Sequence, residues 1–415
     1  MAKKVLVIGS GGREHAIVRA LSLSPQKPQI FCAPGNAGIA VQATCVPIKD
    51  TAVEELVAFA LREGIGLVVV GPEAALAAGV ADAMRAAGIP VFGHGAVATR
   101  IESSKEFAKQ VMAAAGVPTA GYRSFDNFDE ALAYVAARPF PAVLKYDGLA
   151  AGKGVVIAAD LAEAEAALRD MLLDAAFGKG RVVVEDWLEG PEFSFMAFVD
   201  GTRVYPMPLA QDHKRAYDGD KGPNTGGMGA YTHLPFITGE DREFALEHIL
   251  RPVAAEMVRR GTPLCGVLYG GLMKTAQGVK VIEFNARFGD PETEVVLPLL
   301  DSDILDVFES VACGRELAPL NWSDDFTMGV VMASKGYPGK YEKGYAISLP
   351  EGYDFVHMGT GNKDGQLVTA GGRVLMSVAR AATFEQAREQ AYKAVEAVEC
   401  DNLFWRRDIA HQANG

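Results

Sequence analysis

The first hundred residues alternate between short apolar runs and helical patterns, and this alternation limits the possible folds more than any other feature of the chain. The apolar runs are "KKVLVIG", "QIFCAP", "GLVVVG" and "PVFG". Helical patterns lie between them, at about residues 13–22, 53–62 and 77–87. Strands that alternate with helices are typical of βαβ units and a parallel sheet, whose ligands bind at the carboxyl ends of the strands. The sequence therefore predicts an N-terminal parallel α/β domain over residues 1–102.

The strict alternation ends near Glu102. A helical stretch, "SSKEFAKQVMAAAG", is followed by the strand "VPTAGYRSF", a hairpin, and a helix at about residues 161–173. After "NWSDDFTMG", two strands and an amphipathic helix at about residues 383–398 indicate a small α+β domain. The 415 residues, 49% of them hydrophobic, suffice for roughly two to four domains. We predict a multidomain protein of α/β and α+β class, divided at 1–102, 103–325 and 326–415.

The composition argues against several classes of protein. A net charge of −12 argues against broad binding to nucleic acid or to an anionic membrane. The five cysteines form no CxxC pair, and the sequence shows no secretory or transmembrane segment, so we expect a cytoplasmic protein with reduced thiols. The seven histidines form no HxH or HExxH motif, which argues against zinc.

The stretch "KYDGLAAGKGV", residues 145–155, contains the residue types of a phosphate-binding loop at a different spacing. Gly148 and Gly152 enclose three residues instead of the four of a P-loop, and Gly154 follows Lys153. Val-rich strand patterns flank the stretch on both sides, so we expect the tip of a hairpin. Without a helix after it, this segment cannot bind phosphate through a helix N-terminus.

The stretch "GSGGREH", residues 9–15, follows the first strand and opens a helix, which is the right context for phosphate binding on backbone N–H groups. It is not a complete GxGxxG motif, and the second strand ends in "APGN" without an acid for a ribose hydroxyl, so NAD is disfavoured. A phosphate monoester fits better, with Arg13 adding charge and Asn36 facing the same edge. A tight turn needed only for packing is the alternative.

The stretch "VIEFNARFGDPE" places Glu283, Asn285 and Arg287 at alternate positions, which on a strand face the same way. Carboxylate and amide oxygens suit Mg²⁺, and an arginine beside them could stabilise a transferred phosphoryl group. An exposed strand face with solvated charges is the alternative.

Two further stretches are candidates for ligand binding. In "VVVEDWLEGPEFS", backbone groups at a crossing between strands could pair with a purine edge and Glu192 could reach ribose hydroxyls, although a plain connector is about as consistent with the pattern. In "QDHKRAYDGDKGPNTGGMG", successive glycines can turn several N–H groups onto one anion, and the acids could hold an ammonium group. A merely flexible loop is the alternative. His213 fits a structural or orienting role better than proton transfer, since the sequence shows no partner for it.

Nine segments, in order and at plausible spacing, resemble the ATP-grasp family, and within it the ligases that join glycine to 5-phosphoribosylamine. They are "VLVIGSGGREHA", "APGNAG", "VVGPEAAL", "ESSKEFAK", "LKYDGLAAGKGVV", "QDHKR", "DGDKGPNTGGMGAY", "IEFNARFGDPE" and "ASKGYPGKY". The resemblance implies a central ATP-grasp core with a small mobile lid at residues 122–188. It also implies ATP and Mg²⁺ or Mn²⁺ as cofactors, and a reaction in which the glycine carboxylate is phosphorylated and the ribosylamine nitrogen then displaces the phosphate.

The resemblance also implies roles for individual residues. The catalytic residues are Arg287, Asp212 and Lys145. The ATP-binding residues are Lys105, Lys145, Gly152, Lys153, Gly154, Glu185, Asp186, Trp187, Leu188 and Glu192. The residues for glycine and 5-phosphoribosylamine are Gly11, Gly12, Arg13, Asn36, Asp212, Lys214, Asn224, Gly226, Gly227 and Met228. The metal ligands are Glu283 and Asn285.

Three other functions stay open at this point. Another ATP-grasp ligase or carboxylase acting on a ribonucleotide would share the ATP site. A Rossmann-type dinucleotide-dependent oxidoreductase would bind NAD(H) instead of ATP. An ATP-binding regulatory module without turnover is disfavoured, because Glu283, Asn285 and Arg287 are all present. We expect small-molecule substrates, a monomer, and no nucleic-acid or membrane partner.

Overall fold

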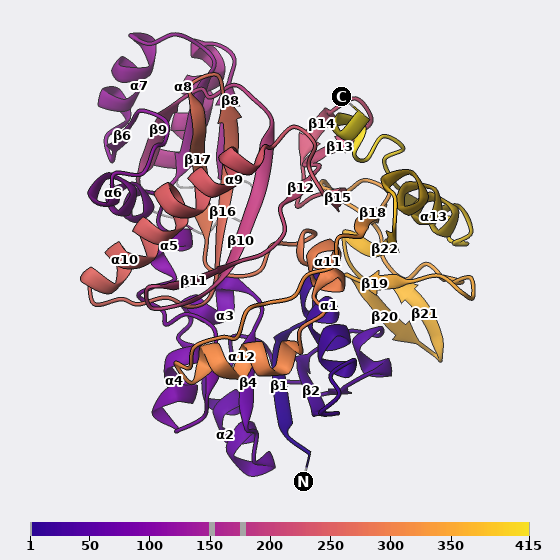
Figure 1. Cartoon of the computed structure of the whole chain (residues 1–415). Coiled ribbons are helices and arrows are strands. Elements are labelled where there is room, and N and C mark those ends of the chain that lie inside the picture. The colour runs from indigo at the N-terminus through magenta and orange to yellow at the C-terminus, as the bar shows by residue number, and fades with distance from the viewer. Residues whose placement is uncertain (1, 149–153, 175–179, 415) are drawn as a thin grey trace.

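The N-terminal part of the chain forms a parallel sheet (Figure 1). The computed structural model describes residues 2–148, 154–174 and 180–414. Within residues 2–102, all of which are described, five strands pair in the order β3-β2-β1-β4-β5. The strands are β1 (Lys4–Gly9), β2 (Gln29–Pro34), β3 (Thr44–Cys45), β4 (Leu67–Val70) and β5 (Val91–Phe92). The helices are α1 (Gly12–Ser22), η1 (Ile39–Val41), α2 (Val53–Glu63), α3 (Glu73–Ala77), α4 (Val80–Ala86) and α5 (Arg100–Ser103).

Helices cover both faces of this sheet, which explains why its central strands are continuously apolar. Val7 of β1 packs in one cluster with Ile17 of α1, and Ile8 packs in another cluster with Phe59 of α2. The predicted parallel domain is confirmed. The helix predicted at about 77–87 is present as α4, which begins only at Val80 because Gly79 before it has a left-handed φ of 86°; the short α3 was not predicted.

The small sheet predicted as a lid is present at the upper left of Figure 1. Its described strands pair antiparallel in the order β6-β9-β7-β8. They are β6 (Tyr122–Phe125), β7 (Ala142–Tyr146), β8 (Val155–Ala158) and β9 (Val182–Asp186). Helices α6 (Lys105–Ala115), α7 (Phe128–Ala136) and α8 (Leu161–Leu172) accompany them. The predicted hairpin is correct, since β7 and β8 pair on either side of the glycine-rich stretch, whereas α7 was not predicted.

The remaining part of the chain is built on a large sheet with the path β17-β16-β10-β12-β15-β18-β22-β19 among the described residues. Its strands are β10 (Glu192–Asp200), β11 (Arg203–Pro206), β12 (Ala210–Asp212), β15 (Gly229–Thr232), β16 (Cys265–Thr275), β17 (Gly278–Asn285), β18 (Phe326–Ser334), β19 (Phe355–His357), β22 (Arg373–Ala381) and β23 (Leu403–Phe404). Two ribbons lie outside it, β13 (Arg215–Tyr217) with β14 (Lys221–Asn224), and β20 (Thr360–Lys363) with β21 (Gln366–Thr369). The central and C-terminal parts of the chain therefore share one sheet.

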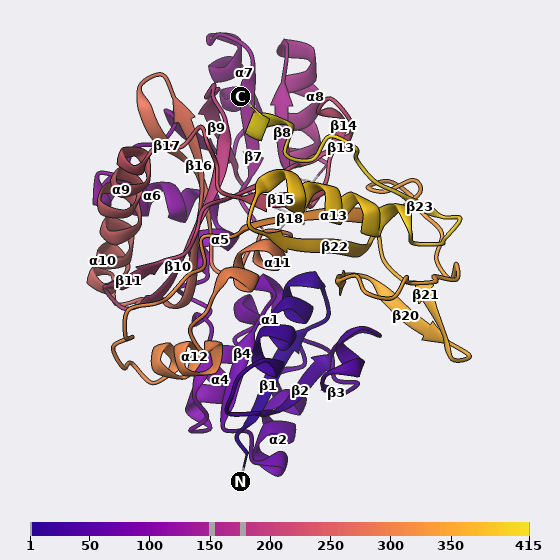
Figure 2. The ribbon, with the colours of Figure 1, turned by 45° about the vertical axis from the view of Figure 1, so that its right-hand side comes forward.

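Helices pack on both ends of this large sheet. They are α9 (Gly239–Ala245), η2 (Leu246–Leu250), α10 (Arg251–Arg259), α11 (Thr293–Val296), η3 (Leu297–Leu299), α12 (Ile304–Ala312), α13 (Phe384–Glu396) and η4 (His411–Asn414). Figure 2 shows α13 lying across β18 and β22, as predicted for the C-terminal α+β part. In the described ranges, no helix has the length and apolar character to span a membrane.

Four buried phenylalanines join the N-terminal sheet to the large sheet. Phe92 of β5 lies 4.4 Å, between ring centroids, from Phe308 of α12, and 6.1 Å from Phe198 of β10. Phe288 completes the group, 6.0 Å from Phe198. Each ring is at most 2% exposed, so this contact excludes water between the two parts of the chain.

We expect Phe308→Ala to destabilise the protein by about 3–5 kcal/mol, because it leaves a cavity in this contact. Phe244→Ala is the matched control, since the Phe244 side chain is 38% exposed. Urea unfolding followed by tryptophan fluorescence measures both variants. Equal losses of stability in the two would show that the cluster does not hold the sheets together.

Candidate active site

The site is centred on β17, where the two candidate metal ligands lie. Glu283 is half-buried and Asn285, the last residue of the strand, is 7% exposed. Burial acts to raise the pKa of Glu283, but nearby cations lower it further, so its pKa lies below its ordinary value. These cations are Lys214, Lys145, Lys105 and Arg287. The three lysines come from distant stretches of the sequence, and the fold brings them close to one carboxylate.

A carboxylate that stays ionised and an amide oxygen beside it are suitable ligands for Mg²⁺. Asn285 Oδ1 also accepts a hydrogen bond from Arg287 Nη2 at 3.3 Å, which orients the amide. The donor set therefore fits a hard divalent cation. The alternative, a solvated strand face, does not apply to Asn285, because this side chain is buried.

Arg287 lies two residues beyond the end of β17 and is held by two carboxylates from the N-terminal part of the chain. Its Nη2 lies 2.9 Å from Glu102 Oε1, and its Nε lies 3.4 Å from Glu73 Oε2. Glu102 also accepts from the backbone N–H of Ala286 at 2.7 Å. Burial opposes the charge on Arg287, but Glu102 and Glu73 more than offset it, so its pKa lies above the ordinary value. The guanidinium is therefore charged and fixed in place.

A buried group of two lysines and one glutamate connects the small sheet to β17. Glu185 Oε1 lies 3.0 Å from Lys145 Nζ, and Glu185 Oε2 lies 3.1 Å from Lys109 Nζ. Lys145 Nζ also donates to the carbonyl of Ile282, next to Glu283, at 2.9 Å. Burial lowers the pKa of Lys109 to about 8, against the opposing effect of Glu185. Lys145 is thus positioned by this group at the strand that carries the metal candidates.

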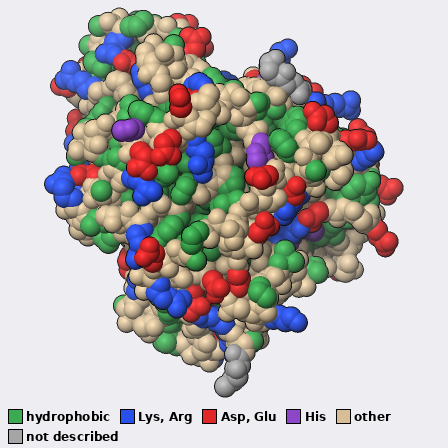
Figure 3. All heavy atoms as spheres, viewed as in Figure 1, with side chains coloured by type: hydrophobic (Ala, Val, Ile, Leu, Met, Phe, Trp, Pro, Cys, Tyr) green, Lys and Arg blue, Asp and Glu red, His purple; other side chains and the backbone are tan. Residues whose placement is uncertain are grey.

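Sequence reasoning missed Lys109, although it lies one helical turn after Lys105 on α6. It also assigned Glu185 only through its backbone, whereas its side chain is buried between the two lysines. Both lysines lie in the interior of the protein, since Lys109 is 2% exposed and Lys145 is 3% exposed. On the face seen in Figure 3, charged side chains of both signs are interspersed.

The start of the glycine-rich stretch is tied to the N-terminus of α6. Lys105 Nζ donates to the carbonyl of Gly148 at 2.9 Å, and the Glu106 N–H donates to Asp147 Oδ1 at 3.1 Å. Gly154, at the other end, accepts from the Tyr146 N–H at 2.7 Å. The predicted residues Gly152 and Lys153 lie outside the described residues.

The predicted purine-binding segment borders a cavity of about 490 Å³. The lining residues are Ala120, Gly121, Asp186, Trp187, Leu188, Glu189, Thr275, Ala276, Gln277 and Lys280. Asp186 pairs with Arg138, and Trp187 is 44% exposed at the rim. Glu192, predicted to hold a ribose, forms an ion pair of 3.1 Å with Lys214.

We call residues 212–229 the polar segment. Asp212 is the last residue of β12 and Lys214 follows two residues later, and the charge of each affects the pKa of the other. Burial raises the pKa of Asp212 to about 7, with Lys214 opposing the rise and the Glu292 and Glu192 carboxylates adding to it. Glu192 raises the pKa of Lys214 well above its ordinary value. Lys214 is therefore a permanent cation, and Asp212 titrates near neutral pH.

The glycines of this segment do not form the predicted anion nest. The N–H of Gly226 donates to Tyr337 Oη, and that of Gly227 donates to Thr225 Oγ1, each at 3.0 Å. The N–H of Met228, which is fully buried, donates to the carbonyl of His213 at 2.7 Å. Each of these N–H groups has a separate partner within the protein, and the assignment of these residues to the amino-acid substrate stays a prediction. Asn224 is exposed at the end of β14.

The turn after β1 likewise differs from the predicted phosphate site. The Gly11 N–H donates at 2.6 Å to Glu14 Oε2, so the chain's own carboxylate occupies the N-terminus of α1. Arg13 is buried and pairs with Glu14 at 2.8 Å. Asn36 uses both donors, to the carbonyls of Ser10 and His357, and its Oδ1 accepts from two backbone N–H groups. In this structure the Gly11 N–H is therefore used within the protein, and the binding of a substrate phosphate at this turn stays a prediction.

Gly12 makes room for a carboxyl group that sequence reasoning did not single out. A Cβ at Gly12 would lie 2.5 Å from Glu294 Oε1. Glu294 is 1% exposed, and neither of its carboxyl oxygens has a hydrogen-bond partner among the described residues. Burial, and then the charge of Asp290, raise the pKa of Glu294 well above its ordinary value. Burial and the charge of Asp290 thus favour the neutral form of Glu294 beside the turn.

The chain matches three family models in succession. They describe the N domain, the ATP-grasp (A) domain and the C domain of phosphoribosylglycinamide synthetase, and they match residues 3–102, 103–293 and 327–412. The chain belongs to the phosphoribosylglycinamide synthetase family. The resemblance to ATP-grasp proteins and the predicted fold class are thereby confirmed.

Individual members of the phosphoribosylglycinamide synthetase family match over nearly the whole chain. A phosphoribosylamine–glycine ligase of Halalkalibacterium halodurans is 50% identical, covering 99% of this chain and 97% of its own. One of Lactococcus lactis is 45% identical, covering 99% of this chain and 100% of its own. The crystal structure of one from Thermotoga maritima is 34% identical with a TM-score of 0.87, covering 98% and 99% of the two chains.

A more distant structure shares the fold alone. The biotin carboxylase domain of a 2-oxoglutarate carboxylase from Hydrogenobacter thermophilus is 18% identical, with a TM-score of 0.76, and covers 100% of this chain and 93% of its own. Membership of the phosphoribosylglycinamide synthetase family argues against the dinucleotide-dependent oxidoreductase alternative.

We expect Asp212→Asn to raise the melting temperature at pH 8 but not at pH 4. The folded-state pKa of about 7 lies above the ordinary value of 3.8, so the folded protein binds the proton more tightly. Stability therefore falls as pH rises from about 4 to 7, and the full penalty of the buried charge is present above pH 7. Asparagine removes that penalty.

Thermal unfolding without ATP or Mg²⁺ measures this effect. Asp170→Asn, a change of the same kind on the exposed surface of α8, is the control and should shift neither value. A stabilisation by Asp212→Asn that is the same at pH 4 and pH 8 would contradict the raised pKa.

Proposed function

We propose that this protein is an ATP-dependent carbon–nitrogen ligase that joins glycine to 5-phosphoribosylamine, giving glycinamide ribonucleotide, ADP and phosphate. The observation that carries the proposal is the ionised Glu283 on β17, close to three lysines from other segments and to Arg287, in a chain that matches the three domain models of the family in succession. The reaction belongs to purine biosynthesis.

The chemistry requires activation of a carboxylate, which is a poor electrophile at neutral pH. In the proposed first step, a glycine carboxylate oxygen takes the γ-phosphoryl group of ATP, giving glycyl phosphate and ADP. In the second step, the amine nitrogen of phosphoribosylamine attacks the carbonyl carbon, phosphate leaves, and the nitrogen loses a proton. The protein mainly positions the reactants and neutralises charge.

We assign the ATP side of the site to the small sheet and β17. Lys105, Lys145 and Gly154 bind the phosphates, whereas Gly152 and Lys153, predicted for the same role, lie outside the described residues. The small sheet is the proposed lid, with bounds at 122–188. Residues 185–188 contact the adenine through backbone groups, and Glu192 contacts the ribose. Glu283 and Asn285 hold Mg²⁺ or Mn²⁺, which neutralises phosphate charge when bound.

We assign the reacting groups to Arg287 and Asp212. Arg287 is charged and fixed by two carboxylates, so it can stabilise the charge that develops on the transferring phosphoryl group. Asp212 has a pKa of about 7, which suits a group that receives the proton lost by the amine.

The substrate side is assigned to two segments. Glycine contacts Asp212, Lys214 and the segment containing Asn224, Gly226, Gly227 and Met228. Phosphoribosylamine contacts Gly11, Gly12, Arg13 and Asn36, and since the Asn36 side chain is saturated within the protein, its contact is through backbone groups. We further propose a cytoplasmic monomer with domain boundaries at 1–102, 103–325 and 326–415.

We expect purified protein to release ADP from ATP only when glycine, 5-phosphoribosylamine and Mg²⁺ are all present. A coupled assay for ADP, with mass spectrometry of the product, measures this. Product formed with bicarbonate or formate, and none with glycine, would instead identify another ATP-grasp ligase acting on a ribonucleotide.

We expect Glu283→Gln to lower kcat about 100-fold or more, because it removes the charged oxygen that holds the metal while leaving the side-chain volume unchanged. Glu54→Gln, on the exposed face of α2, is the control for loss of one carboxylate. Steady-state kinetics at increasing Mg²⁺ measures both. A Glu283→Gln variant with normal kcat and normal dependence on Mg²⁺ would exclude Glu283 as a metal ligand.

A further inference from the structure

Residues near the C-terminal end of the chain form hydrogen bonds and ion pairs with the polar segment, which carries Asp212 and Lys214. We call residues 406–412 the C-terminal clamp. The Arg406 side chain is fully buried, and its Nη1 donates to Asp220 Oδ1 at 2.8 Å and to the carbonyl of Arg215 at 3.1 Å. Its Nε and Nη2 donate to the two carboxyl oxygens of Asp408, at 2.8 and 2.9 Å. A bidentate pair of this kind fixes the guanidinium plane as well as its position.

Further contacts run along the whole clamp. The N–H of Arg407 donates to Asp218 Oδ1, and the N–H of Gly219 donates to Asp408 Oδ2, each at 2.7 Å. Gln211 Nε2 donates to Gln412 Oε1 at 2.6 Å. The clamp therefore holds the segment at its beginning, next to β12, and at its outer turn.

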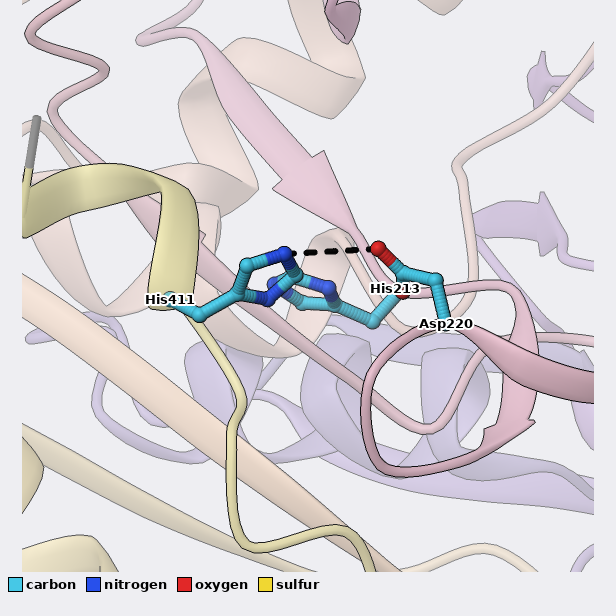
Figure 4. A group of neighbouring side chains, drawn as sticks. All are labelled: His213, Asp220 and His411. Carbon is cyan, nitrogen blue, oxygen red and sulfur yellow. Dashed lines mark ion pairs between the residues drawn. The ribbon is translucent and has the colours of Figure 1, made fainter.

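His213 is the residue of the polar segment that contacts the clamp between Asp212 and Lys214. The N–H of Ala410 donates to His213 Nε2 at 2.8 Å, and the His213 ring lies 5.2 Å from that of His411. Figure 4 shows these two rings beside Asp220, with the ion pair between His411 Nε2 and Asp220 Oδ2, which are 3.3 Å apart. Asp220 thus joins the outer turn to two residues of the clamp, Arg406 and His411.

Two histidines and an aspartate this close have the composition of a metal site. The hydrogen bonding argues against that interpretation. Because His213 Nε2 accepts from a backbone N–H, the ring proton of the neutral imidazole is on Nδ1, which leaves no free lone pair for a metal. Asp220 Oδ1 is also occupied by Arg406. The group is better explained as a latch between the clamp and the segment.

The side chains on either side of His213 have partners outside the clamp. Lys214 pairs with Glu192, and its charge acts on Glu283. The charges that act on Asp212 are those of Lys214, Glu292 and Glu192. The clamp therefore contacts His213, while its neighbours Asp212 and Lys214 interact with charged groups of the proposed reaction centre.

We propose that the C-terminal clamp positions Asp212 and Lys214 for the amino-acid substrate, and that Arg406 is the positioning residue through which it acts. This inference rests on the proposed function, because it takes glycine as the ligand of those two residues. Loss of the clamp leaves the ATP groups in place, since Lys105, Lys145 and Glu283 lie on other elements. The expected effect is weaker use of glycine with ATP binding retained.

The test compares Arg406→Met with Arg407→Met. The two changes remove the same charge from adjacent residues, but the Arg407 side chain is exposed and only its backbone contacts the segment. We expect Arg406→Met to raise the KM for glycine about tenfold or more, with the KM for ATP unchanged, because the loss affects one substrate. Arg407→Met should leave both constants at the values of the unaltered protein.

Hydrogen exchange of residues 212–229 supplies a structural measurement on the same proteins. Faster exchange there in Arg406→Met, but not in Arg407→Met, supports the proposal. Asp220→Ala removes the Arg406 and His411 contacts from an exposed turn, so it provides the same comparison where Arg406→Met fails to fold. It should raise the KM for glycine in the same way.

Three outcomes would overturn the inference. One is a KM for glycine that is equal in the Arg406→Met and Asp220→Ala variants and in the control. Another is a parallel rise in the KM values of glycine and ATP, which a general loss of structure would cause. The third is a gain in melting temperature when zinc chloride is added to the unaltered protein but not to His411→Gln, which would make the group a metal centre. If the unaltered protein does not use glycine at all, the proposed function itself fails, and the two failures are therefore distinguishable.

Discussion

The backbone pairing of β15 with β18 is the constraint on which the arrangement of the site depends. It joins the central strands to the C-terminal strands, with Gly229 opposite Val330 and Ala230 opposite Gly329. The approach is close, because a Cβ at Gly229 would lie 2.7 Å from the carbonyl oxygen of Gly329. The polar segment between β12 and β15 is therefore held at both ends by strands of one sheet. The C-terminal part of the chain cannot move independently of the segment that carries Asp212.

Charge pairing inside the protein explains why residues from distant segments are needed at one place. The two lysines around Glu185 are buried and Arg287 is partly buried, and a buried charge without a partner is strongly destabilising. Glu73 and Glu102 from the N-terminal part supply the partners of Arg287, and Glu185 of β9 supplies the partner of both lysines. The correct geometry of the reaction centre thus depends on docking of the N-terminal and small sheets.

The fold was largely predictable from the sequence because its signals are local. Apolar strands and glycine-rich turns identified the N-terminal sheet and the β7–β8 hairpin, and the alternation in "EFN" placed Glu283 and Asn285 on one strand. What could not be predicted depends on tertiary partners. Glu14 folds back onto the Gly11 N–H, and the N–H groups of Gly226 and Gly227 each donate to a different side chain. Neither spacing nor residue type reveals those contacts.

The C-terminal clamp shows the same limit most clearly. The sequence "WRRDIAHQ" contains two adjacent arginines, and residue type alone does not distinguish them. In the structure Arg406 is fully buried and Arg407 is exposed, and only the position of Asp220 and Asp408 distinguishes them. Asp220 lies 186 residues before Arg406 in sequence, on the turn between the paired strands β13 and β14. Local order in the polar segment and order at the end of the chain therefore depend on each other, because each supplies the charges that allow the other to be buried.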